Sequence, residues 1–318
     1  MSEALLEVIA PGMLTSVQDL GRFRVAHLGI SPGGAADLWA LEVANALVGN
    51  ESREAALEMT MVGGTFRFHQ DVWIALTGAS CAIRVGDHRH GHELPMWTSV
   101  LIEKNQTVTI GSLELGARMY LAVSGGLEAS SFFGSRSTHL SGPWGGPFHR
   151  SLQTGDILRS AHSKCWPRPR RSGIQVRSLY RSFHELRVTL GPQADDYSAD
   201  VREKFFNSDF EVSADSNRRG LRLIGPSIHS LNDDELISEG VAAGAIQVTS
   251  SGQPLILFCE QQTTGGYRKI ANVIGADLFK LGQLRPGQKI RFRRVEFDEA
   301  WEALAEQDKL RSVMALSL

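Results

Sequence analysis

The sequence predicts a mainly β protein built from two domains. The chain has 318 residues, more than a single domain usually contains, which favours two separate cores. Short apolar or alternating segments, each bounded by glycine, asparagine or aspartate, recur along most of the chain and are typical of strands in a barrel or sandwich. Two prolines and three arginines crowd residues 165–173, which indicates an exposed connector. We therefore predict domains at 1–165 and 174–318.

The first predicted domain opens with an extended segment at residues 5–9 and a turn-rich segment. Apolar residues then recur at helical spacing over residues 36–48, with Asp37 as the expected N-cap and Gly49 as the stop. Beyond this helix, short apolar runs predict strands at 65–68, 72–77, 82–85, 100–103, 107–110 and 119–123.

The second predicted domain repeats this pattern. Its expected strands cover residues 186–190, 211–213, 245–249, 254–258 and 289–295. An amphipathic helix is expected from about Asp298 onward, where Trp301, Leu304 and Leu310 contribute to a partial apolar stripe. The two domains are thus expected to be β-rich, with few helices.

Charge and cysteine content restrict the class of protein. Lys plus Arg number 33 and Asp plus Glu number 35, so no strong field attracts nucleic acid or an anionic membrane. The first residues lack the pattern of a signal peptide, and no apolar run approaches the ~20 residues of a membrane-spanning helix. Three scattered cysteines are typical of free thiols. We expect a cytoplasmic protein that binds neither nucleic acid nor membrane.

Several familiar catalytic motifs are absent, including the phosphate loop, the dinucleotide fingerprint, the zinc-protease helix motif and the nucleophile elbow. His88, His90 and His92 alternate and would share one face of a strand, as a metal site requires. Glycines and a proline flank them, which favours a polar hairpin tip. We therefore predict no metal site.

The most informative segment is Glu260-Gln-Gln-Thr-Thr-Gly-Gly-Tyr-Arg-Lys269, which follows an apolar strand. Hydroxyls and unhindered backbone N–H groups at one turn favour anion binding, and a phenol and a cation follow directly. A tight turn with a polar rim is the alternative. The candidate residues here are Glu260, Gln262, Thr263, Thr264, Gly265, Gly266, Tyr267 and Lys269.

Three further segments combine cations, hydroxyls and glycines. Gly134-Ser-Arg-Ser-Thr138 suits a carboxylate or phosphate, and Asn217-Arg-Arg-Gly220 has the same character but also fits a capped surface turn. Residues 15–22 and 31–37 supply acids and backbone donors in two further turns, although Asp19 and Arg22 also fit a structural ion pair. The candidates are Gln18, Asp19, Arg22, Asp37, Arg136, Ser137, Thr138, Asn217 and Arg218.

Nine separated motifs resemble one known family. They are Thr15-Ser-Val-Gln-Asp-Leu-Gly-Arg22, Gly33-Gly-Ala with Asp37, Ala44-Asn with Leu47-Val-Gly-Asn50, Leu57-Glu-Met-Thr60, Leu76-Thr-Gly-Ala79, Gly134-Ser-Arg-Ser-Thr138, Gly191-Pro-Gln193, Ser216-Asn-Arg218 and Gln262-Thr-Thr-Gly-Gly-Tyr267. In this order they are similar to the allophanate hydrolase subunit 2 family, also called biotin-dependent carboxyltransferase or KipA-like. The family usually has Asp-Arg where this chain has Glu260 and Gln261.

The resemblance implies two cyclophilin-like β-barrel domains and a sister subunit of similar fold. Family members include the C subunit of ATP-dependent 5-oxoprolinase, the carboxyltransferase region of urea carboxylase and a regulator of a kinase inhibitor. A free-standing chain without a Met-Lys-Met biotinylation site most resembles the 5-oxoprolinase member. The expected partners are the A and B subunits of 5-oxoprolinase, and ATP with Mg²⁺ is expected to be shared with the sister B subunit.

The expected reaction opens the lactam of 5-oxo-L-proline to give L-glutamate, after phosphoryl transfer activates the amide. We expect Arg136 and Asn217 to hold anionic groups, Lys269 with the Gly265–Gly266 turn to stabilise developing negative charge, and Glu260 or Asp19 to handle protons or a metal. Two alternatives stay open. One is a carboxyltransferase that depends on biotin, and the other is a non-catalytic binding module.

Overall fold

The computed structural model describes residues 3–86, 91–162, 169–180, 182–232 and 236–316, and it divides into two units. Unit 1 comprises Met1–Arg22, Gly33–Arg181 and Ser312–Leu318, and unit 2 comprises Phe23–Pro32 and Ser182–Arg311. The predicted domain ranges, 1–165 and 174–318, differ from these units at residues 23–32, between residues 165 and 182, and at residues 312–318, which are assigned to unit 1. The domain ranges stay a prediction.

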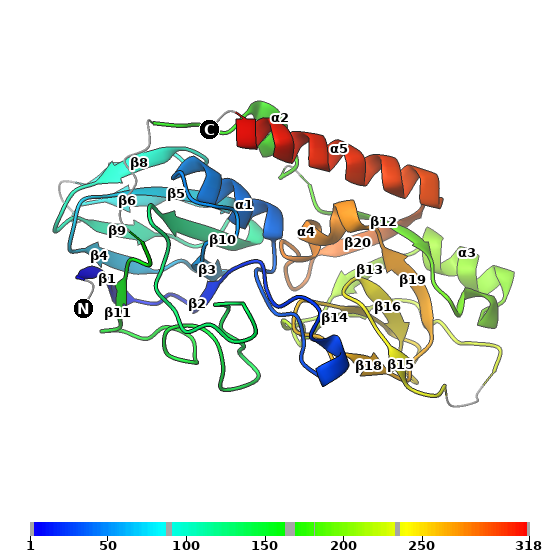
Figure 1. Cartoon of the computed structure of the whole chain (residues 1–318). Coiled ribbons are helices and arrows are strands. Elements are labelled where there is room, and N and C mark those ends of the chain that lie inside the picture. The colour runs from blue at the N-terminus through cyan, green and yellow to red at the C-terminus, as the bar shows by residue number, and fades with distance from the viewer. Residues whose placement is uncertain (1–2, 87–90, 163–168, 181, 233–235, 317–318) are drawn as a thin grey trace. The chain divides into compact units, whose positions relative to one another are not determined.

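Unit 1 contains two antiparallel sheets around a shared core (Figure 1). The six-stranded sheet has the order β11 (Ile157–Arg159), β1 (Ala4–Ala10), β4 (Thr65–Phe68), β9 (Thr107–Ile110), β6 (Ile83–Val85) and β7 (His92–Glu93). The five-stranded sheet has the order β2 (Leu14–Gln18), β3 (Ala56–Thr60), β10 (Leu115–Val123), β5 (Val72–Ser80) and β8 (Ser99–Ile102). The mainly β class is confirmed, and in this unit it takes the form of paired sheets.

Strand β10 is buried along almost its whole length because both of its faces are covered. Met119, Leu121 and Val123 alternate along one face and belong to the core between the sheets. The opposite face lies under helix α1 (Leu38–Leu47), which packs against β5 and β10 (Figure 1). The predicted N-cap of α1 is confirmed, since the Asp37 side chain accepts a hydrogen bond from the Ala40 N–H.

Unit 2 is built on a closed barrel of seven strands. Their order is β12 (Glu185–Leu190), β19 (Lys269–Val273), β16 (Ala245–Val248), β17 (Pro254–Leu257), β14 (Gly220–Ile224), β13 (Asp209–Val212) and β20 (Lys289–Arg294). The parallel pairing of β20 with β12 closes the barrel, and closure removes the edges that an open sheet would present. A separate two-stranded ribbon joins β15 (Glu239–Gly240) to β18 (Thr264–Gly265).

The remaining helices are short except for the last one. They are α2 (Ile174–Ser178), α3 (Ala199–Asn207), α4 (Leu278–Leu281), α5 (Phe297–Leu316) and the 3₁₀ turns η1 (Ala26–Leu28), η2 (Ala194–Asp196) and η3 (Gly275–Asp277). Helix α5 confirms the expected C-terminal helix, and its Ala300 and Ala303 pack against Ile274 and Val295. None of the helices in the described ranges combines the length and apolar character needed to cross a bilayer.

One expectation about local structure was wrong. The segment at 15–18 was expected to be a turn but lies in strand β2, whose polar side chains are buried. The connector expected at 165–173 is irregular in its described part, and Pro169, Arg171 and Gly173 are exposed, as predicted. This part is tied to the segment at the start of β8, because the Ser99 N–H donates to the Arg170 carbonyl and the Ser172 N–H donates to the Trp97 carbonyl.

The expected polar hairpin at the alternating histidines is present in its described part. Strands β6 and β7 pair antiparallel, with Val85 opposite His92. His88 and His90 lie outside the described residues, and so does Cys165 of the predicted connector.

Candidate functional site

In unit 1, Asp19 lies directly after β2 and joins that strand to the segment containing Arg136. Its carboxylate accepts hydrogen bonds from the Gly21 N–H at 2.8 Å, from the Ser135 hydroxyl at 2.6 Å and from the Arg136 N–H at 2.6 Å. The Ser137 hydroxyl also donates to it, and that hydroxyl accepts from the Asp19 N–H at 2.9 Å. Only 5% of Asp19 is exposed. Because a buried carboxylate needs donors to offset its lost hydration, this network fixes both segments.

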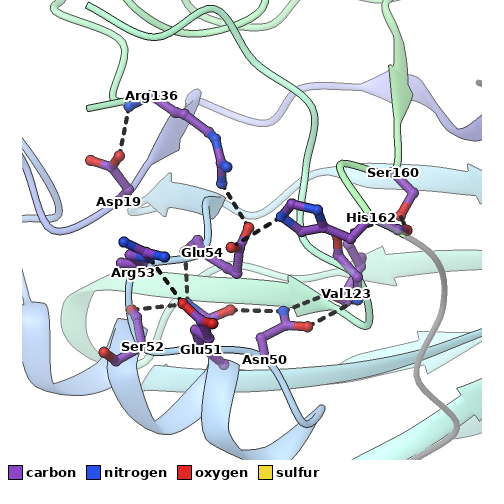
Figure 2. Close-up of polar contacts among 12 residues, drawn as sticks. Asp19, Asn50, Glu51, Ser52, Arg53, Glu54, Val123, Arg136, Ser160 and His162 are labelled. Atoms are coloured by element: carbon purple, nitrogen blue, oxygen red, sulfur yellow. Dashed lines mark hydrogen bonds and ion pairs between the residues drawn. The ribbon is translucent and has the colours of Figure 1, made fainter. Parts of the chain in front are cut away.

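The side chain of Arg136 is held by a second acid, Glu54. Nη1 of Arg136 donates to Oε2 of Glu54 at 2.7 Å, and Nε2 of His162 lies 3.3 Å from Oε1 of Glu54. Figure 2 shows Glu54 between these two cationic or potentially cationic groups. The Glu54 side chain is 8% exposed and that of Arg136 is 28% exposed. Glu54 therefore orients a guanidinium that solvent and ligands can still reach.

The loop that carries Glu54 is itself anchored. Nδ2 of Asn45 donates to the Glu54 carbonyl at 2.7 Å. Asn50 holds the neighbouring turn, since it donates to the Val123 carbonyl at 2.8 Å and accepts from the Gly125 N–H at 2.9 Å (Figure 2). Gly126 has a φ of 64°, and a Cβ there would lie 2.5 Å from Oε2 of Glu54. Only glycine fits this close approach.

Gln18, Arg22 and Thr138 complete the buried part of this cluster. Nε2 of Gln18 donates to the Thr138 carbonyl at 3.0 Å, and Nη2 of Arg22 donates to the Ser137 carbonyl. The Arg22 guanidinium also lies 5.7 Å from the centre of the Phe132 ring. The side chains of Gln18, Arg22 and Thr138 are almost completely buried. The hydrogen bonds of these side chains are made to other protein groups. Arg136 is therefore the most accessible of the predicted charged groups in unit 1.

Asp37 works as a helix cap in a buried network of its own. Its Oδ1 accepts from the Ala40 N–H at 2.9 Å and its Oδ2 accepts from the Tyr180 hydroxyl at 2.8 Å. The Tyr120 hydroxyl donates to Glu58 at 2.6 Å. Burial, together with the nearby carboxylates, holds the pKa of both tyrosines well above the usual value. These tyrosines therefore remain neutral donors.

In unit 2, Lys269 begins strand β19 and its ammonium group is paired with the Glu239 carboxylate. The Gln193 side chain contributes twice: its Nε2 donates to Oε1 of Glu239 at 2.7 Å, and its Oε1 accepts from the Lys269 N–H at 3.1 Å. The hydrogen bond from Lys269, followed by that from Gln193, lowers the pKa of Glu239. Two donor side chains thus converge on one carboxylate oxygen.

The turn that precedes Lys269 reaches the same region through strand pairing. Gln247 of β16 lies opposite Lys269, and its side chain is fully buried. Gly265 of β18 pairs with Glu239 of β15, and a Cβ at Gly265 would lie 2.6 Å from Nε2 of Gln247. The predicted Thr264 pairs with Gly240 in the same ribbon, and the Thr263 carbonyl accepts from the Val241 N–H. Within the predicted Thr-Thr-Gly-Gly turn, Thr264 and Gly265 thus form strand β18, which belongs to the ribbon that carries Glu239.

Glu260 and Arg218 form a separate ion pair in unit 2. Nε of Arg218 donates to Oε1 of Glu260 at 2.6 Å, and both side chains are buried. The predicted Asn217 lies in the adjoining turn, where its Oδ1 accepts from the Arg219 N–H at 2.8 Å. The Glu260 carboxylate is therefore already bonded to a guanidinium, which suits a fixed counter-ion.

A polar cavity of about 600 Å³ opens beside the Thr-Thr-Gly-Gly turn. Three predicted residues line it, namely Gln262, Gly266 and Tyr267. Its wall also includes Arg268, which pairs with Asp196 at 2.8 Å. Its volume lies within the usual range for sites that bind small molecules. Lys269 itself does not line this cavity.

Residues 28–294 match the model of a family described as "Carboxyltransferase domain, subdomain A and B". The chain belongs to this carboxyltransferase family. The family resemblance derived from the nine sequence motifs is therefore confirmed, and so is the likeness to the C subunit of 5-oxoprolinase.

Two kinds of curated relative of this carboxyltransferase-family chain stand out. It is 38% identical over 318 residues to the 5-oxoprolinase C subunit of Escherichia coli, covering 99% of each chain, and 33% identical to the protein of that name from Haemophilus influenzae, covering 93% of each. It is also 31% identical to "Urea amidolyase" of Saccharomyces cerevisiae, of which it spans 17%.

Two solved structures of urea-processing enzymes share the fold of this chain. The Kluyveromyces lactis urea amidolyase and urea carboxylase match 99% of this chain with TM-scores of 0.91 and 0.89 at 30% identity. The chain spans 20% and 29% of those two proteins. The mainly β fold is therefore shared with a module of much longer enzymes.

The predicted candidates fall into two groups, each described within its own unit. Unit 1 brings Gln18, Asp19, Arg22, Arg136, Ser137 and Thr138 together, and it uses Asp37 as a cap. Unit 2 brings Lys269 beside the Thr-Thr-Gly-Gly turn and pairs Arg218 with Glu260. The prediction overlooked Glu54, Gln193, Glu239 and Gln247. Only Gln193 carried a signal, because it ends the Gly-Pro-Gln motif.

The described residues include no group of three or more His, Cys, Asp or Glu that could hold a metal ion. The roles predicted for each site residue stay predictions, with Asp19 and Glu260 already engaged in the bonds given above.

Proposed function

We propose that this protein is the C subunit of an ATP-dependent 5-oxoprolinase that hydrolyses 5-oxo-L-proline to L-glutamate. The observation that carries the proposal is the 38% identity to the E. coli 5-oxoprolinase C subunit over 99% of both chains. Similarity over 99% of both chains favours the same role in an enzyme complex, whereas a shared module alone would match only part of the relative. The proposed partners are the A and B subunits, and the proposed location is the cytoplasm.

The proposed chemistry opens a stable five-membered lactam. ATP with Mg²⁺, shared with the sister B subunit, supplies the phosphoryl group that activates the amide. This chain binds and orients the substrate and neutralises charge, which is the main task of a protein in such a transfer. Lys269 and the Gly265–Gly266 turn stabilise negative charge, and Arg136, oriented by Glu54, holds an anionic group. Asn217 is the second proposed anion contact.

The test is conversion of 5-oxo-L-proline to glutamate by this chain mixed with candidate A and B subunits, compared with the same mixture lacking it. We expect turnover that requires ATP and all three chains. Lys269→Ala should lower the rate at least about 100-fold, as expected when one charge-stabilising donor is lost. Lys289→Ala removes an exposed lysine of β20 and is the matched control. Normal turnover with Lys269→Ala contradicts the assigned role.

A second candidate is a carboxyltransferase that uses carboxybiotin from a separate carrier. The TM-scores of 0.91 and 0.89 against urea amidolyase and urea carboxylase favour it. The same assay separates the two proposals when it is repeated with avidin, which sequesters biotin. Turnover insensitive to avidin supports the oxoprolinase, whereas no lactam turnover, together with biotin-dependent carboxyl transfer, supports the alternative. If neither activity appears, the binding-module interpretation becomes the next to test.

A further inference from the structure

The two members of the Lys269–Glu239 ion pair differ strongly in exposure. The side chain of Lys269 is 5% exposed, whereas that of Glu239 is 44% exposed. A buried ammonium group needs a counter-ion, because an unpaired charge away from water is costly. An exposed carboxylate has no such need, since water solvates it well. The lysine therefore depends on the pair more than the glutamate does.

The two residues also differ in how firmly their backbones are held. Lys269 begins a barrel strand that pairs with β12 on one side and β16 on the other. Glu239 belongs to β15, a strand of two residues that pairs with β18 outside the barrel. Short ribbons with few buried contacts are among the parts of a fold that open most easily. Lys269 is therefore held firmly in the barrel, whereas Glu239 belongs to an element that opens more easily.

The donors around Glu239 form a site for one anionic oxygen. Nζ of Lys269 and Nε2 of Gln193 both point at Oε1 of Glu239. A cation and an amide N–H that converge on one oxygen are the arrangement that binds a ligand carboxylate. The Glu239 carboxylate thus fills a position that a ligand of the same chemistry fits.

We propose that Glu239 is an exchangeable counter-ion, which gives up its place between Lys269 and Gln193 to the carboxylate of the ligand. The inference rests on the proposed function only for the identity of that ligand, 5-oxo-L-proline. Exchange of one carboxylate for another keeps the buried ammonium group neutralised throughout. Glu239 then sets how tightly the site holds anions, because every ligand competes with it.

Acylation of Lys269 by a succinimidyl ester tests the exchange without the partner subunits. The rate is followed by mass spectrometry of the peptide containing Lys269, in the wild type and in Glu239→Ala. We expect the variant to react about fivefold faster, which corresponds to loss of an ion pair of about 1 kcal/mol. Acetate should then slow the variant to near the wild-type rate, whereas chloride at equal ionic strength should not. Glu185→Ala, which removes an exposed acid paired with Arg293, is the control.

The outcomes separate this inference from the proposed function. An unchanged rate in Glu239→Ala, or equal effects of acetate and chloride, overturns the exchange. Protection by acetate together with failed lactam turnover in the subunit mixture keeps the exchange and rejects the oxoprolinase. Replacing acetate by 5-oxo-L-proline, and then by 2-pyrrolidinone, which lacks the carboxylate, identifies the group that binds. Protection by both compounds alike contradicts a carboxylate-specific site.

Discussion

Asp19 in unit 1 and Glu239 in unit 2 are both carboxylates held by several donors, but the surroundings of the two differ. Asp19 is 5% exposed and accepts hydrogen bonds from two hydroxyls and two backbone N–H groups, so it joins two segments of chain. Glu239 is 44% exposed at its side chain and accepts from the side chains of Lys269 and Gln193. A carboxylate is thus a permanent structural acceptor in unit 1 and, in our proposal, a replaceable counter-ion in unit 2.

The strongest test of this contrast is Asp19→Asn. The amide would present its own N–H group to donors that now face a carboxylate, which leaves buried groups unsatisfied. We expect a loss of about 3 kcal/mol in the free energy of unfolding, measured by urea denaturation. Asp195→Asn removes a fully exposed acid and should cost less than about 0.5 kcal/mol. A loss below about 1 kcal/mol for Asp19→Asn would show that the Asp19 hydrogen-bond network contributes little to the stability of the fold.

Glu54 lies between these extremes, since it is buried but orients the partly exposed Arg136. We expect Glu54→Gln to lower kcat/KM of the reconstituted enzyme about tenfold, because a charge-assisted bond that orients the guanidinium is lost. The double variant with Arg136→Lys should lose little more than the larger single loss, as coupled residues do. Glu51→Gln, which alters an exposed neighbour paired with Arg53 (Figure 2), is the control. Additive losses would argue against positioning.

The smallest expected effect is the contribution of Glu239 to stability. Because the folded-state pKa of Glu239 is lowered, its stabilisation is present above the unfolded pKa of about 4.3 and is lost as pH falls through the folded pKa. The free energy of unfolding of the wild type should exceed that of Glu239→Gln by less than about 1 kcal/mol at neutral pH, and the difference should vanish in acid. Urea denaturation of both proteins across this pH range measures it. A difference as large as that for Asp19→Asn would erase the contrast.

Strands that are bounded by glycine, asparagine or aspartate were predictable from sequence. The bounds predicted for residues 65–68 and 107–110 are those of β4 and β9. Strand β2 was missed because its polar residues resemble a turn, although they are buried by a segment more than 100 residues away. Helix α3 was missed because most of its residues are polar and only Phe205 is buried. Long-range burial of polar side chains leaves no local pattern.

The candidate site shows the same limit. Lys269 and the glycine turn were found because hydroxyls, glycines and a cation stand together in the chain. Their partners were not, because Glu239 lies 30 residues before Lys269 and Glu54 lies 82 residues before Arg136. Only the strand pairing of β15 with β18 brings Glu239 to the turn. A single sequence contains no record of that pairing.

The assignment of residues 23–32 to unit 2 has a consequence for synthesis. This segment leaves the ribosome 150 residues before Ser182, the start of the remainder of its unit, since 182 minus 32 is 150. At about 5–20 residues per second the interval is roughly 8 to 30 seconds. Unit 2 therefore stays incomplete until residues 182–311 have been synthesised, and most of unit 1 is synthesised during this interval. For the same reason, no single cut in the gene separates the two units intact.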